Sequence, residues 1–71
     1  MYVIYSEAET RLNEELGPAF WKNDEGWTTL EDATMFFPKP QGYAIGTEVM
    51  TISKALHLQT LFELTKDMEV E

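Results

Sequence analysis

The single histidine, His57, is the natural starting point, because the chain has no cysteine. A thiol nucleophile, a cysteine-rich zinc site and a site with several histidine ligands are therefore excluded. Ser53 precedes His57 by four residues, a spacing that places both on one face of a helix. A serine hydrolase also needs a strained turn and an oxyanion hole, and the sequence around Ser53 has neither. We interpret Ser53 as a helix cap and His57 as a surface residue, and we expect no catalytic residue.

Acidic residues occur in adjacent pairs at Glu14 and Glu15, Asp24 and Glu25, and Glu31 and Asp32. Neighbouring carboxylates do not face one another on a helix or a strand, so these pairs are poor acid/base dyads and good solvated surface. A calcium loop centred on Gly26 would need a ligand oxygen at its first position, which is occupied by Trp21. We therefore expect no metal and no cofactor.

Charge restricts the partners of this chain. Thirteen acidic residues against five basic ones give a formal net charge of −8 in 71 residues. Excess carboxylate repels nucleic-acid phosphate and anionic lipid and attracts basic protein surfaces. The lysines are scattered, so no basic stripe for nucleic acid exists. We expect a protein partner with a basic surface, no direct binding of nucleic acid and no membrane association.

Length and composition predict one globular domain over residues 1–71. Hydrophobic residues make up 44 % of the chain and aromatic residues 13 %, which is too apolar for a disordered acidic tail. A core of this size is marginal, so self-association as a homodimer is an alternative. No apolar run reaches a membrane span and the N-terminus lacks the basic region of a signal peptide, so we expect a cytoplasmic protein. The polar residues 67–71 are predicted to form a frayed tail.

The first third of the chain predicts a strand followed by a helix. Residues 2–5 are β-branched or aromatic, as in a strand. Ser6 and Glu9 have the spacing of a capping box, which predicts a helix over residues 7–16 that ends at the Gly-Pro dipeptide 17–18. Apolar residues recur along this helix as a stripe of Ala8, Leu12 and Leu16.

The middle of the chain predicts a β-hairpin. Residues 20–21 and Trp27 are separated by the turn-forming residues 23–26, with Gly26 at the position that most needs a positive φ. After the hairpin we expect a helical turn or a bend at 30–33, extended structure at 35–37, a loop at 38–42 and a strand at 43–45.

Residues 47–68 contain no Gly or Pro and carry two competing patterns. Ala55, Leu58, Leu61 and Phe62 fit one face of a helix, whereas Leu56, Leu58, Phe62 and Leu64 alternate as in a strand. Helix propensity favours a helix over 53–66 with Ser53 as its cap, and the strand stays open. The predicted fold class is α+β: a short antiparallel sheet packed against an N-terminal helix and a C-terminal helix.

Aromatic residues cluster between positions 20 and 43. Adjacent aromatics on a strand point to opposite faces, so one of Phe20 and Trp21 is expected outside the core. An exposed aromatic residue with a charged rim is typical of a protein-binding surface. The predicted partner-binding residues are Glu14, Glu15, Trp21, Asp24, Glu25, Trp27, Glu31 and Asp32.

Residues 20–36 resemble a pattern of small acidic proteins of phages and mobile elements. In it an aromatic–x–Asn–x–x–Gly–Trp turn precedes a Leu–x–x–Ala–Thr–x–Phe segment. The resemblance covers about a quarter of the chain and implies a hairpin scaffold. Short, acidic, cysteine-free chains are also similar, at the level of class, to phage-encoded inhibitors of host nucleases, including anti-CRISPR proteins.

These observations predict a non-enzymatic inhibitor whose acidic surface mimics DNA and engages a basic, nucleic-acid-binding surface in the host cytoplasm. One alternative is a self-associating structural or accessory phage protein. A weaker alternative is a cation-binding module or an enzyme subunit.

Overall fold

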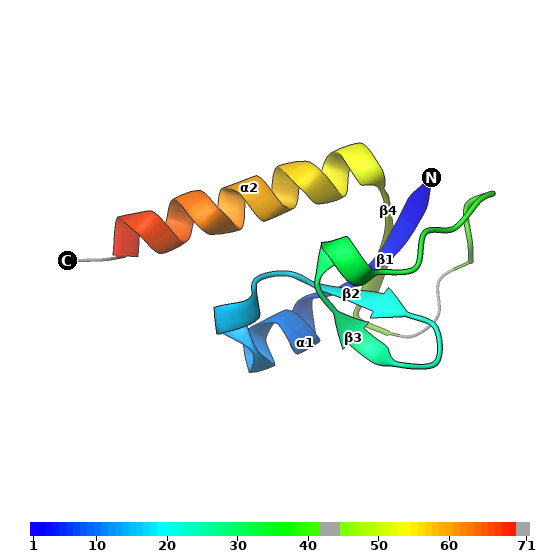
Figure 1. The fold of residues 1–71 in the computed structure, drawn as a ribbon, viewed down its shortest axis with the longest axis horizontal. Helices are drawn as coiled ribbons and strands as arrows, with labels where there is room; N and C mark the ends of the chain where they lie inside the picture. Colours follow the sequence, from blue (N-terminus) through cyan, green and yellow to red (C-terminus); the bar gives the residue numbers. More distant parts are fainter. Residues whose placement is uncertain (42–44, 70–71) are drawn as a thin grey trace.

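The computed structural model describes residues 1–41 and 45–69. Four strands form one antiparallel sheet in the order β3-β2-β1-β4. Two α-helices and two short 3₁₀ helices, η1 and η2, complete the fold (Figure 1). In chain order the elements are β1 (Tyr2–Ser6), α1 (Glu7–Leu12), η1 (Glu14–Leu16), β2 (Ala19–Lys22), β3 (Gly26–Thr28), η2 (Leu30–Asp32), β4 (Thr47–Thr51) and α2 (Ile52–Glu69). The predicted α+β class with a helix at each end of the chain is confirmed.

Strand β1 is the centre of the sheet. It pairs with β4 along its whole length, from Tyr2 opposite Thr51 to Ser6 opposite Thr47. It pairs with β2 only at its last two residues. Beyond that point the two strands diverge and the segment 34–36 lies between them: the Thr34 amide donates to the Trp21 carbonyl, and Phe36 exchanges two backbone hydrogen bonds with Tyr2. This insertion supplies backbone partners that the divergence would otherwise leave unsatisfied.

The core lies between the sheet and the first half of α2. Val3, Phe20 and Met50 project from the sheet and cluster with Ala55 of α2. Leu30 and Ala33, in and just after η2, close the same cluster. Val3, Phe20 and Ala55 are fully buried. Because Leu30 and Ala33 belong to this cluster, the turn at 30–33 helps to build the core.

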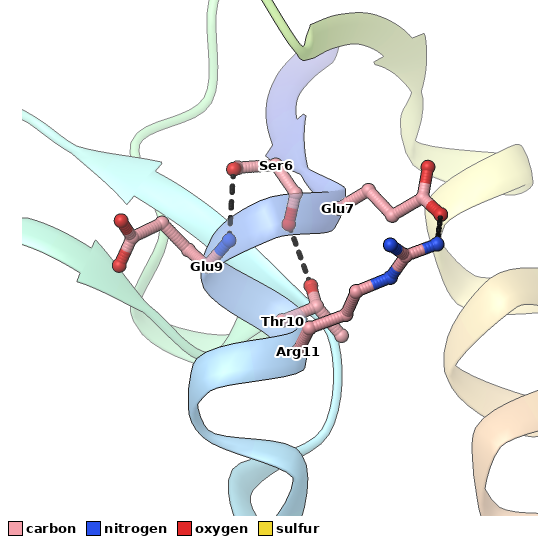
Figure 2. A network of polar contacts seen from close by, with 5 residues as sticks. All are labelled: Ser6, Glu7, Glu9, Thr10 and Arg11. Carbon is pink, nitrogen blue, oxygen red and sulfur yellow. Dashed lines mark hydrogen bonds and ion pairs between the residues drawn. The ribbon is translucent and has the colours of Figure 1, made fainter.

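Helix α1 begins at the predicted cap. The Ser6 hydroxyl accepts a hydrogen bond from the Glu9 amide at 3.1 Å (Figure 2). Thr10 is buried: its hydroxyl donates to the Ser6 carbonyl at 2.6 Å and accepts from the Ala19 amide at 2.9 Å. An exposed ion pair between Glu7 and Arg11 spans one turn of the same helix. Thr10 therefore ties the helix to the start of β2.

The predicted apolar stripe on this helix is wrong. Leu12 is 74 % exposed and Leu16 is 67 % exposed, whereas Thr10 is the buried position of α1. The helix ends at Leu12 and the chain continues as the 3₁₀ turn η1 instead of running on to residue 16. A 3₁₀ helix has three residues per turn, so the four-residue spacing of the leucines no longer places them on one face.

The predicted hairpin is confirmed. Strands β2 and β3 pair in the register of Phe20 with Thr28 and Trp21 with Trp27. Gly26 has φ +96°, which is the left-handed region expected at this position. Asp24 in the turn also has a positive φ, which Asp tolerates better than most residues.

The helix predicted at 53–66 is confirmed, and the strand alternative for these residues is wrong. Two details of this region differ from the prediction. Strand β4 was not predicted, and the Thr51 hydroxyl, rather than that of Ser53, accepts from the Lys54 amide at 3.2 Å. The sequence passes from strand to helix without Gly or Pro, so nothing marked the boundary.

Two of the expected segments reach beyond the described residues. The strand predicted at 43–45 lies outside them except for Ile45, which is in a turn. The helical backbone of α2 extends through residues 67–69 of the predicted tail, and residues 70–71 lie outside the described part.

Candidate protein-binding groove

A groove of about 520 Å³ lies between the second half of α2 and the connection from η1 to β2. Leu58, Leu61 and Phe62 of α2 line one side, and Leu16 and Pro18 line the other. In Figure 1 the orange and red part of α2 continues past the strands, on the side of the molecule where α1 lies. We call this feature the α2 groove and consider it the candidate site.

The α2 wall of the groove is a single helical stripe. Leu58, Leu61, Phe62 and Thr65 occur at i, i+3, i+4 and i+7, which places them on one face. Leu58 also packs against the core cluster, whereas Leu61 is 45 % exposed. The stripe therefore starts in the core and emerges into solvent along the groove.

The part of α2 that extends past the strands is explained by the difference in length between this helix and the strands. Its 18 residues span about 27 Å, whereas a strand of five residues spans about 17 Å. The sheet cannot cover the whole helix, so apolar residues of its second half remain accessible.

The opposite wall depends on the turn between η1 and β2. Gly17 has φ +85°, so the chain can reverse there at little steric cost. Pro18 follows and is buried. The Ala19 amide is then held by the Thr10 hydroxyl. The buried Thr10 thus positions this wall relative to the sheet.

All the charged residues that line the α2 groove are acidic: Glu15, Glu31 and Glu63. Within the described side chains no Lys, Arg or His lines it. Arg11, Lys22 and Lys54 form ion pairs elsewhere, with Glu7, Glu25 and Glu48 respectively. Glu31 and Glu63 form no ion pair with any side chain that the structure describes. The groove combines apolar lining residues with acidic ones.

The predicted acidic residues divide into separate groups. Glu15 and Glu31 line the α2 groove. Asp24 and Glu25 lie in the β2–β3 turn, at the other end of β2 from η1, and Glu25 pairs with Lys22 at 3.1 Å. Asp32 is exposed on η2. Glu14 belongs to η1, and its side chain is outside the described part of the structure.

The two predicted tryptophans form a pair of their own. Trp21 and Trp27 are cross-strand neighbours whose rings meet edge to face, with centroids 5.2 Å apart. The Trp21 indole nitrogen donates to the Asn23 side chain at 2.9 Å. Strand alternation places Trp21 on the face of the sheet opposite the buried Phe20, as the sequence predicted. Neither tryptophan lines the α2 groove, so they are not its anchors.

The sequence prediction missed the α2 side of this site. Leu58, Leu61 and Phe62 were recognised as a helical face but interpreted as part of a packed helix, and Glu63 was not singled out. The mismatch between a long helix and short strands was the signal that could have identified them.

Other chemistry finds no support in the described residues. They contain no group of three or more His, Asp or Glu side chains that could hold a metal ion. Their helices are too short or too polar for a bilayer-spanning segment. Ser53 and His57 are both exposed on α2. What the α2 groove can do is bind: it offers apolar surface to bury and carboxylates to attract a cation.

No protein-family model, no curated protein and no solved structure matches this chain at the significance that we required. The resemblance of residues 20–36 to small acidic phage proteins therefore stays a prediction. The functional argument rests on the groove and on the distribution of charge.

Proposed function

We propose that this chain is a non-enzymatic binding module that engages a basic surface of another protein. The observation that carries the proposal is the α2 groove, where the charged residues beside the apolar lining are, among the described side chains, all acidic. Apolar surface supplies affinity when it is buried, and carboxylates select a cationic partner and accelerate its association. A net charge of −8 acts in the same direction over the whole molecule.

The narrower proposal is an inhibitor of the phage or mobile-element type that occupies the nucleic-acid-binding surface of a host protein. Anti-CRISPR proteins that mimic DNA are the model for such an activity. Carboxylates on the inhibitor would take the place of phosphates at lysine and arginine side chains of the host protein. Such a protein would act in the cytoplasm of the host cell.

A displacement assay tests this proposal. Fluorescently labelled DNA is bound to a panel of basic, RNA-guided nucleases, and the chain is titrated at about 0.05 M and about 0.5 M salt. We expect loss of DNA anisotropy with at least one nuclease at low salt, and a much weaker effect at high salt. Displacement that is independent of salt, or none across the panel, contradicts the proposal.

A second candidate is self-association, favoured by the number of large apolar side chains that are exposed. Those on α1, η1 and α2 are Leu12, Leu16, Leu56, Leu61 and Leu64. A homodimer could bury them, as the sequence also suggested. Sedimentation equilibrium over a micromolar concentration series separates the two: a monomer throughout excludes the dimer at these concentrations.

A further inference from the structure

We infer that the α2 groove binds a cationic amphipathic helix of the partner protein. This inference rests on the proposed function and makes it more specific: it names the part of the basic partner that enters and the residues that receive it. Three features of the groove support it, namely its length and lining, its charge, and the poor fit of a second copy of this chain.

The first feature is the geometry of the lining. From Leu58 to Thr65 the α2 stripe rises about 10 Å, which is close to two turns of a partner helix. Its three apolar residues at i, i+3 and i+4, followed by Thr65 at i+7, form a ridge that can pack against the ridges of another helix. Burying such a stripe against an amphipathic helix is a recurring mode of peptide recognition. Leu16 on the opposite wall, 67 % exposed, supplies a second apolar contact for the same helix.

The second feature is charge. Glu31 comes from η2 and Glu63 from α2, yet both line the same groove, and neither has an ion-pair partner among the side chains that the structure describes. An occupant with lysine or arginine beside its apolar stripe would pair with both of them. An anionic occupant would be repelled by the same carboxylates.

The third feature is that a second copy fits the groove poorly. A copy that inserted its own α2 would bring its Glu63 towards Glu31 and Glu63 of the first chain. Both chains carry a net charge of −8, so association also works against their overall repulsion. Of the two lysines of α2, Lys54 pairs with Glu48 at 2.6 Å, and the side chain of Lys66 is outside the described part of the structure. Charge complementarity therefore favours a cationic segment of another protein.

The experiment uses two labelled peptides and the full chain. Both peptides are about 18 residues long and alanine-rich to favour a helix, with leucines at i, i+3, i+4 and i+7; one carries four lysines beside the leucines and the other four glutamates at the same positions. Fluorescence anisotropy at about 0.05 M salt measures binding. We expect saturable binding of the lysine peptide and at least tenfold weaker binding of the glutamate peptide.

Matched variants locate the binding site. Leu61→Ala removes a groove contact, and Leu64→Ala removes a leucine of the same helix that is slightly more exposed and does not line the groove. We expect Leu61→Ala to weaken binding of the lysine peptide by about tenfold and Leu64→Ala to leave it within twofold. The double variant Glu31→Gln/Glu63→Gln should weaken binding more than Asp24→Asn/Glu25→Gln, which removes the same formal charge at the hairpin turn.

Several outcomes overturn the inference. These are equal binding of the two peptides, equal effects of Leu61→Ala and Leu64→Ala, or binding of neither peptide. A dimer in sedimentation that Leu61→Ala dissociates would instead assign the groove to a second copy. Failure here is distinguishable from failure of the proposed function: if the chain still displaces DNA from a basic nuclease in a salt-dependent manner, the acidic binding function stands and only the helix-in-groove inference falls.

Discussion

The two halves of α2 have the same kind of sequence and different environments. In the first half Ala55 is fully buried and Ile52 and Leu58 pack against the core. In the second half Leu61 and Leu64 are 45 % and 54 % exposed, and Phe62 lines an open groove. The first half supplies the α2 residues of the core cluster. The second half presents apolar surface for binding.

The largest expected effect on stability is in the first half of α2, which packs against the core and is called the packed half below; the second half is called the open half. Ala55→Asp would place a carboxylate in the core without a partner, and we expect it to lower the free energy of unfolding by about 3 kcal/mol or more. Leu64→Asp, in the open half, should change it by less than about 0.5 kcal/mol. Urea denaturation measures both. Similar losses in the two variants would show that the halves of α2 are equally packed.

The second largest effect on stability is expected in the η1–β2 wall of the α2 groove, which faces the open half of the helix. Thr10→Val keeps the shape of the side chain but leaves the Ala19 amide without the hydroxyl that it binds, which should cost about 1–3 kcal/mol. Thr60→Val is the matched control, because the Thr60 hydroxyl binds the Leu56 carbonyl on the exposed side of α2. We expect a change below about 0.5 kcal/mol for this control. Chemical denaturation compares them, and a larger loss in Thr60→Val would contradict this role of Thr10.

The start of the packed half gives a smaller effect. Thr51→Ala removes the hydroxyl that accepts a hydrogen bond from the Lys54 amide. Loss of such a helix cap lowers the free energy of unfolding by about 1 kcal/mol. Ser53→Ala removes the hydroxyl of the residue that the sequence predicted as the cap, and it should leave the free energy of unfolding almost unchanged. Thermal unfolding followed by circular dichroism ranks the two variants. If Ser53→Ala is the more destabilising, Ser53 is the cap after all.

The smallest effect on stability is expected in the open half. Leu61→Ala should lower the free energy of unfolding by less than about 1 kcal/mol, because nearly half of the side chain is already exposed. The same variant should weaken binding of the lysine peptide. A large loss of stability would mean that Leu61 supports the fold, and the distinction between the two halves would be lost.

Local patterns predicted much of this structure. The Ser6 cap, the hairpin with its left-handed Gly26 and the C-terminal helix were all predicted, because each depends on a few neighbouring residues with strong conformational preferences. The errors arose where partners are distant in sequence. Strand β4 is recognisable only through its pairing with β1. Leu12 and Leu16 do not share one helical face, because α1 ends at Leu12 and Leu16 belongs to η1.

In the candidate site, too, local features could be predicted from the sequence, whereas contacts between residues distant in sequence could not. The residue types alone establish an excess of carboxylates and the absence of cysteine, which excludes thiol chemistry, and they predict a helical stripe in the last third of the chain. Which acids lie together depends on the fold: it brings Glu15, Glu31 and Glu63 to one groove and leaves Asp24 and Glu25 at the hairpin turn. The reason is geometric. Residue types set charge and local conformation, whereas the lengths and pairing of the strands set where α2 loses its cover and which distant side chains border the opening.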